Sequence, residues 1–183
     1  TKLKRQIKKI GLPAYLKPID NSASRGVYKI NSVKDCQEAF NFSINNCTKN
    51  KLLILEEEIA GPEISVDSII YNNKFYRCGI SDRKFKKKNK FAVQFASITP
   101  TALNKRLTTE AYSLMEKTSK ILKINQSAFK GDLVYDKRDK KIKIIELTAR
   151  LSGGFDAQYR KSLSFGVDLI KVTMLISMNV QLN

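Results

Sequence analysis

Apolar residues recur at helical intervals in several stretches of the chain, and each stretch is bounded by glycine, proline or a polar turn. The clearest is residues 105–122, where Leu107, Ala111 and Met115 would lie on one face of a helix. The predicted helices are Thr1–Ile10, Val33–Asn45, Lys105–Leu122, Tyr159–Ser164 and Val167–Met178.

Between these helices lie apolar runs of strand length, separated by residues that favour turns. The pair Asn72-Asn73 tolerates the positive φ angles of a tight turn, which predicts a hairpin around it. Antiparallel hairpins with helices packed on them form an α+β fold. The predicted strands are Tyr15–Pro18, Val27–Ile30, Leu52–Leu55, Glu63–Tyr71, Lys74–Ile80, Phe91–Ile98, Asp132–Asp136 and Ile142–Leu147.

The last predicted hairpin brings two acidic residues together. A charged turn at residues 137–141 joins its two strands. If that turn is centred on Asp139, Asp132 lies directly opposite Glu146, and facing side chains in such a pair are close neighbours. The hairpin therefore predicts two adjacent carboxylates.

Alternation along the second strand adds further groups to this patch. Glu146, Thr148 and Arg150 would share a face for as long as the strand continues. Neighbouring carboxylates repel unless a cation lies between them, and Mg²⁺ prefers carboxylate and phosphate oxygens. Arg150 would add a fork for a phosphate or carboxylate. The simpler alternative is a surface hairpin whose acids meet by accident.

A polar loop at residues 19–26 joins the first two predicted strands. Its backbone N–H groups and the hydroxyls of Ser22 and Ser24 can face an anion, with Gly26 at its end. Lys17 would point a positive charge to the same place. The alternative is an ordinary serine-rich turn, and no P-loop motif is present.

Composition removes several classes of chemistry. The 183 residues contain no histidine, which excludes Ser-His-Asp and Cys-His machinery. The three cysteines lack CxxC spacing, which favours reduced thiols in a cytoplasmic protein over a zinc or disulfide framework. There is no secretory signal pattern, and the longest apolar run near the end, Gly166–Val180, is too short to span a bilayer.

The formal net charge of +17 has two explanations. It can reflect a polyanionic partner, or a genome rich in A and T, because asparagine and isoleucine are also abundant. Aromatic residues do not alternate with the basic ones as in a base-stacking surface, so nucleic acid is the less favoured partner. The basic run Arg83–Lys90 is either a solvated loop or a mobile lid over phosphates.

Four motifs in order resemble the ATP-grasp family, especially carboxylate–amine ligases such as D-alanine–D-alanine ligase, biotin carboxylase and the large chain of carbamoyl phosphate synthetase. They are LKP with the loop NSASRGV, LILEEEIAGPE, GDLVYD and IIELTARLSGG. The resemblance implies a small nucleotide-binding lobe at residues 1–58 and a second lobe with the metal site at 59–183. It also implies that the nucleotide lies between them.

The resemblance also implies roles for single residues. Lys17 and the loop residues would contact phosphates, Glu56 the adenine amino group, and the backbone at Glu57 and Ile59 the adenine edge. Glu63 would hold the ribose hydroxyls. The metal residues would be Asp132, Glu146 and Thr148, with Arg150 and Lys17 as catalytic residues.

Two departures from the family pattern affect these expectations. Thr148 stands where many members have asparagine. The resemblance therefore implies either one or two bound Mg²⁺ ions, and Mn²⁺ is an alternative metal. The chain also begins with threonine, without the family's preceding domain or its further phosphate-contacting lysine. The resemblance therefore implies a fragment lacking its N-terminal domain.

The expected function is ATP-dependent ligation, in which a carboxylate is activated as an acyl phosphate and then attacked by an amine-type acceptor. Two alternatives remain. One is an ATP-grasp fragment that binds nucleotide without catalysis, and the other is a basic nucleic-acid-binding module.

Overall fold

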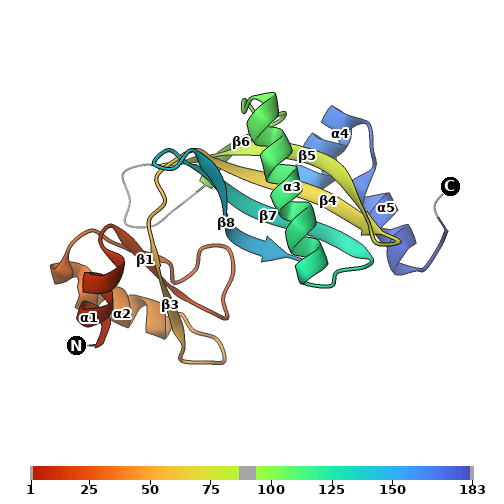
Figure 1. Ribbon diagram of the computed structural model, residues 1–183. Coiled ribbons are helices and arrows are strands. Elements are labelled where there is room, and N and C mark those ends of the chain that lie inside the picture. Colours follow the sequence, from red (N-terminus) through yellow and green to blue (C-terminus); the bar gives the residue numbers. More distant parts are fainter. Residues whose placement is uncertain (1, 87–93, 182–183) are drawn as a thin grey trace. The chain divides into compact units, whose positions relative to one another are not determined.

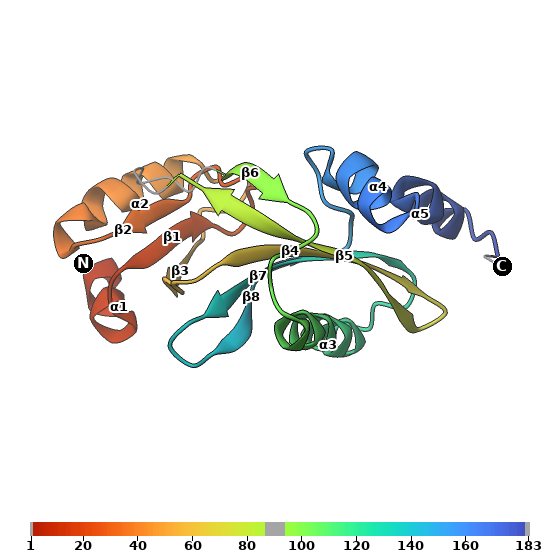
Figure 2. The ribbon, with the colours of Figure 1, turned by 90° about the horizontal axis from the view of Figure 1, so that it is seen from above.

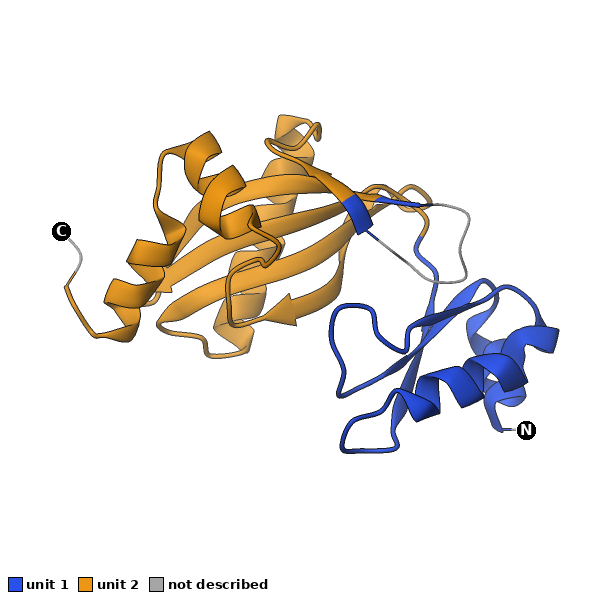
Figure 3. Ribbon diagram, turned by 180° about the vertical axis from the view of Figure 1, so that it is seen from behind, with its two compact units in different colours: residues 1–59, 85–95 blue, residues 60–84, 96–183 orange. Residues whose placement is uncertain are grey.

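The computed structural model describes residues 2–86 and 94–181. The chain divides into two compact units, residues 1–59 with 85–95 and residues 60–84 with 96–183, coloured separately in Figure 3. No helix in the described ranges is long and apolar enough to cross a membrane.

Unit 1 is a small antiparallel sheet with helices. The sheet has the order β2-β1-β3, so β1 is central. The elements are α1 (Lys2–Ile10), β1 (Ala14–Pro18), β2 (Tyr28–Ile30), the 3₁₀ turn η1 (Val33–Asp35), α2 (Cys36–Asn45) and β3 (Leu53–Glu57), labelled in Figure 1.

The helices of unit 1 bury one face of this sheet. Leu16 of β1 and Tyr28 of β2 are directly opposite partners, and both belong to a core completed by α1 and α2. The core residues are Ile7, Leu16, Tyr28, Ile30, Cys36 and Ala39. Because side chains alternate, Tyr15 and Lys17 of β1 point to the opposite face.

Unit 2 contains a larger antiparallel sheet of order β6-β5-β4-β7-β8. Its elements are β4 (Glu63–Tyr71), β5 (Lys74–Phe85), β6 (Gln94–Ile98), α3 (Lys105–Ile121), β7 (Ser127–Asp136), β8 (Lys141–Thr148), the π-helical segment η2 (Asp156–Lys161), α4 (Ser162–Phe165) and α5 (Leu169–Ser177). The antiparallel sheets and packed helices confirm the predicted α+β class.

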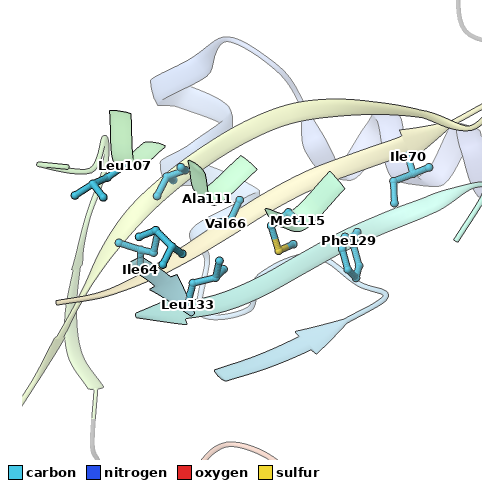
Figure 4. Packing of buried hydrophobic residues seen from close by; sticks show 10 residues of the cluster. Ile64, Val66, Ile70, Leu107, Ala111, Met115, Phe129 and Leu133 are labelled. Carbon is cyan, nitrogen blue, oxygen red and sulfur yellow. The ribbon is translucent and has the colours of Figure 1, made fainter. Parts of the chain in front are cut away.

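Helices cover both faces of the larger sheet (Figure 2). On one face, Ala111 and Met115 of α3 pack against Ile64, Phe129 and Leu133 (Figure 4). On the other face, η2 and α5 pack over a second cluster of Ile69, Cys78, Ala128, Ala157, Leu169 and Ile176. Glu63, Asp132, Glu146 and Thr148, four of the predicted site residues, lie on strands of this sheet.

Three predicted elements need correction. β5 continues to Phe85, so Arg83 belongs to a strand and not to a loop. The helix predicted at 159–164 begins earlier, as the π-helical segment from Asp156. The turn of the last hairpin is not centred on Asp139, because Asp136 pairs with Lys141. Residues 91–93 of the predicted strand 91–98 lie outside the described residues.

Candidate functional site

Asp132 and Glu146 are directly opposite partners in the β7–β8 ladder, as predicted. Next to the turn, however, Leu133 pairs with Ile144, so the register shifts by one residue between these two pairs. The shift inserts Ile145 as an extra residue, which is a β-bulge.

The bulge decides which face Glu146 and Thr148 occupy. An unbroken ladder from the turn would place Glu146 opposite Gly131, whose own face packs against Met115 of α3. The bulge reverses this alternation. Glu146 and Thr148 therefore share a face with Asp132, away from α3.

Asp132 is buried and already carries positive neighbours. Its side chain is 7% exposed, and its Oδ2 lies 2.5 Å from Lys130 Nζ and 3.2 Å from Arg83 Nη1. Arg83 pairs with Glu63 across the β4–β5 ladder, and the same Nη1 lies 3.1 Å from Glu63 Oε2. Arg83 therefore bridges two of the predicted site residues.

Two oxygen atoms of the predicted metal residues lack partners. Among the described residues, the buried atoms Asp132 Oδ1 and Thr148 Oγ1 accept or donate no hydrogen bond. A buried polar atom without a partner is unfavourable, and oxygen donors of this kind suit Mg²⁺. With the exposed carboxylate of Glu146, these residues fit a divalent cation, although the described residues contain no group of three or more acids, cysteines or histidines that could hold one.

Arg150 does not continue the same strand face. β8 ends at Thr148, and Arg150 is exposed, with its Nη1 donating to the Leu151 carbonyl at 2.9 Å. The alternation argument therefore stops before this residue. Its catalytic role stays a prediction.

Sequence reasoning missed a buried ion pair close to this segment. Lys161 Nζ of η2 lies 2.6 Å from Asp67 Oδ2, and both side chains are fully buried. The backbone N–H of Ser152 donates to Asp67 Oδ1 at 3.0 Å. The pair thus fixes the chain just after Arg150, where the sequence offered only isolated charges as a signal.

On the open face of unit 1, lysines and glutamates form ion pairs. Lys17 Nζ lies 2.6 Å from Glu56 Oε2, and Lys29 Nζ lies 2.6 Å from Glu58 Oε1. Tyr15 also donates to Glu58 Oε1 at 3.3 Å. Two predicted site residues, Lys17 and Glu56, are therefore in direct contact.

The loop with the predicted phosphate-binding residues is held by its own polar contacts. The Ser22 backbone N–H and Arg25 Nε both donate to Asn21 Oδ1, and Arg25 Nη2 donates to Ser22 Oγ at 3.1 Å. Ser24 has a φ of +58° and Gly26 a φ of +80°. A Cβ at Gly26 would lie 2.6 Å from the Cβ of Asn46, so the chain packs tightly here.

The start of this loop is tied to residues 48–50 by one carboxylate. The backbone N–H groups of Asn50, Lys49 and Thr48 donate to Asp20 and lower its pKa to about 2. Hydrogen bonds to the ionised form cause this shift. Asp20 therefore holds the loop more strongly when its carboxylate is charged.

The remaining predicted contacts of the nucleotide involve the end of β3. Glu57 is exposed and Ile59 half-buried, and the neighbouring Glu58 N–H donates to the Pro13 carbonyl at 2.9 Å. Their adenine-reading roles stay predictions. Residues 87–90 of the basic run Arg83–Lys90, expected as a solvated loop or a lid, lie outside the described residues.

The sequence matches the ATP-grasp domain family over residues 10–157. The chain therefore belongs to the ATP-grasp family, and the two antiparallel sheets with helices are its fold. Among curated proteins, none matches this chain.

Several solved structures share the fold. A biotin carboxylase–ATP complex from Campylobacter jejuni superposes with a TM-score of 0.83 at 19% identity, over 98% of this chain and 40% of that one. The biotin carboxylase domain of 2-oxoglutarate carboxylase from Hydrogenobacter thermophilus, in complex with MgADP and bicarbonate, has a TM-score of 0.82 at 22% identity. The match covers 98% of this chain and 39% of that one. An L-amino acid ligase from Bacillus licheniformis has a TM-score of 0.77 at 20% identity, over 93% of this chain and 40% of that one. The chain thus spans about two fifths of each of these proteins.

Proposed function

We propose that this chain is the nucleotide-binding part of an ATP-dependent ligase that joins a small carboxylate to an amine-type acceptor. The observation that carries the proposal is the pairing of Asp132 with Glu146, together with two buried oxygens, Asp132 Oδ1 and Thr148 Oγ1, that have no hydrogen-bond partner within residues 2–86 and 94–181. Membership of the ATP-grasp family supports it, as do the ligands named for the two biotin carboxylase structures.

In the proposed reaction, a substrate carboxylate oxygen attacks the γ-phosphorus of ATP, and the bond from that phosphorus to the β–γ bridging oxygen breaks. ADP leaves, and an acyl phosphate remains. The amine then attacks the acyl carbon, phosphate departs with the bonding electrons, and the amine loses a proton. Such chemistry depends mainly on positioning and on neutralising charge.

The chain's own residues would divide these tasks. In unit 1, Lys17 and the loop with Ser22, Ser24 and Gly26 bind phosphates, and Lys17 releases Glu56 when it does so. Glu56 then accepts from the adenine amino group, while the backbone at 57–59 contacts the ring edge. These assignments use the contact between Lys17 and Glu56 as their structural support.

In unit 2, Glu63 would bind the ribose hydroxyls, and Asp132, Glu146 and Thr148 would hold Mg²⁺. The metal would supply positive charge to the phosphate oxygens. Arg150 would stabilise the transferred phosphoryl group with its guanidinium.

Calorimetric titration with ATP, with and without Mg²⁺, tests the nucleotide and metal assignments. We expect Mg²⁺ to tighten ATP binding in the wild type and not in Glu146→Ala. Glu116→Ala is the matched control, because it removes a half-buried carboxylate from α3, the helix that packs on the sheet face opposite to the Asp132 side chain. An ATP affinity that changes neither on adding Mg²⁺ nor in the Glu146→Ala variant would contradict the metal assignment.

An ATP-grasp fragment that binds nucleotide without catalysis is the second candidate, because Arg83 and Lys130 already neutralise the predicted metal carboxylate of Asp132. Hydroxylamine distinguishes the two, because it traps acyl phosphates as hydroxamates. Hydroxamate formed from ATP and a panel of small carboxylates would support the ligase. ATP binding without hydroxamate would support the inactive fragment.

A further inference from the structure

Arg83 is held by two acids at once. Its Nη1 lies 3.1 Å from Glu63 Oε2 and 3.2 Å from Asp132 Oδ2, and the Arg83 side chain is 16% exposed. The β4–β5 ladder places Glu63 directly opposite Arg83, so the pair with Glu63 is built into the strand register. Asp132 lies on β7, which is on the other side of β4 from β5.

Asp132 uses only one of its oxygens for this contact. Arg83 and Lys130 both lie at Oδ2, and the buried Oδ1 makes no hydrogen bond among the described residues. A buried carboxylate needs positive charge nearby, and the two cations supply it. The second oxygen stays available for a further ligand.

A divalent cation at Asp132 would meet two positive charges already in place. Like charges close together in a partly buried site repel strongly. One of the two must move for the metal to bind well. Arg83 has a second acid, Glu63, within contact distance, whereas Lys130 pairs with Asp132 itself.

We propose that the Arg83 guanidinium forms an ion pair with Asp132 when no metal is bound. When a metal binds to Asp132, this ion pair breaks and Arg83 keeps its ion pair with Glu63. This inference rests on the proposed metal site. Arg83 is then a residue that sets metal affinity. It keeps the buried carboxylate neutralised in the empty protein, and it weakens metal binding by competing for Asp132.

Binding of Mn²⁺ alone, followed by the loss of its free electron paramagnetic resonance signal, tests this without nucleotide or turnover. We expect Arg83→Gln to bind Mn²⁺ about tenfold more tightly than the wild type, because one competing charge is removed. Arg106→Gln makes the same charge change on the exposed surface of α3, where screening limits its effect. Equal affinities in the two variants would overturn the proposal.

Glu63→Gln should change the Mn²⁺ affinity in the opposite direction, and this test can be made even if Arg83→Gln fails to fold. Without the Glu63 carboxylate, Arg83 loses the acid to which it would transfer and is held more firmly at Asp132, so Mn²⁺ binding should weaken several-fold. That effect should shrink in the Arg83→Gln/Glu63→Gln double variant, because the two residues act through one contact. The Arg106–Glu110 pair on α3 gives a matched cycle with Glu110→Gln, in which we expect no coupling. A Glu63→Gln effect no larger than that of Glu110→Gln would overturn the proposal.

The metal site and the role of Arg83 can fail separately. If the wild type shows no Mn²⁺ binding that Asp132→Asn abolishes, the metal site is wrong and the role of Arg83 falls with it. If Asp132→Asn abolishes binding but Arg83→Gln does not tighten it, only the role of Arg83 is wrong.

Discussion

Asp132 faces Glu146 across the β7–β8 ladder only because Ile145 is an extra residue in β8. The turn alone would give a register in which Glu146 faces Gly131 and the α3 side of the sheet. The β-bulge restores the pairing that places both carboxylates on one face. With Ile145 present in β8, the candidate metal site therefore depends on the ladder accommodating this residue as a bulge.

Deleting Ile145 should preserve the site. The pairs on either side of the bulge, Leu133 with Ile144 and Asp132 with Glu146, would become consecutive pairs of a regular ladder. We therefore expect the deletion variant to keep Mn²⁺ binding within a few-fold of the wild type. Deleting Leu147 is the control, because it would turn Thr148 towards α3 and should weaken Mn²⁺ binding. If loss of Ile145 abolishes binding and leaves the circular dichroism spectrum unchanged, the bulge itself is part of the site.

Gly26→Ala should destabilise unit 1 more than Gly11→Ala. Both glycines have a positive φ, +80° and +92°, so alanine costs roughly 1–2 kcal/mol of backbone strain at each position. A Cβ at Gly26 would also lie 2.6 Å from the Asn46 Cβ and 2.7 Å from Pro18 Cγ, whereas Gly11 faces open space. The overpacking adds about 1–3 kcal/mol. Urea unfolding of the two variants measures the difference, and equal free energies of unfolding would contradict the tight packing of this loop.

Lys161→Met should lower the free energy of unfolding by about 3–5 kcal/mol, because it leaves the fully buried carboxylate of Asp67 without its cation. The double variant Asp67→Asn/Lys161→Met should recover part of this loss. It removes the uncompensated charge and keeps an oxygen to accept from the Ser152 N–H. Urea unfolding of the two single variants and the double variant measures the coupling. Additive effects would show that the pair acts as two independent residues.

Acid should loosen the loop held by Asp20. Its pKa is lowered from 3.8 to about 2 in the folded chain, so its stabilising effect is complete above about pH 4 and is lost as the pH falls towards 2. Asp20→Asn should therefore be less stable than the wild type at pH 6, and the two should converge near pH 2. Thermal unfolding midpoints across this range measure the effect. A constant difference between the two proteins down to pH 2 would assign the role of Asp20 to something other than its charge.

Much of the fold could be predicted from the sequence, because the patterns that indicate helices and hairpins involve residues close together in the chain. The apolar stripe of α3 and the hairpin at Asn72-Asn73 depend on neighbours within a few residues, and both appear as predicted. The Asp132–Glu146 pair was predicted correctly from an incorrect turn, because the bulge offset the error in register.

Residues fixed by distant partners could not be found in this way. Arg83 looked like the start of a solvated basic run, yet the ladder with Glu63 extends β5 through it. Lys161 follows Arg160 in a polar stretch, yet it is buried by a partner 94 residues away. A charged side chain is normally exposed, so only the position of Asp67 explains its burial.

The contact between Lys17 and Glu56 makes recognition conditional on two features of a ligand at once. A bare phosphate that takes Lys17 leaves Glu56 without its cation, and a bare amine that takes Glu56 leaves Lys17 without its anion. A molecule that offers both an anion and a hydrogen-bond donor, correctly spaced, satisfies the two residues together. This face of unit 1 should therefore prefer such a molecule to inorganic phosphate or polyphosphate, in spite of the chain's large positive charge.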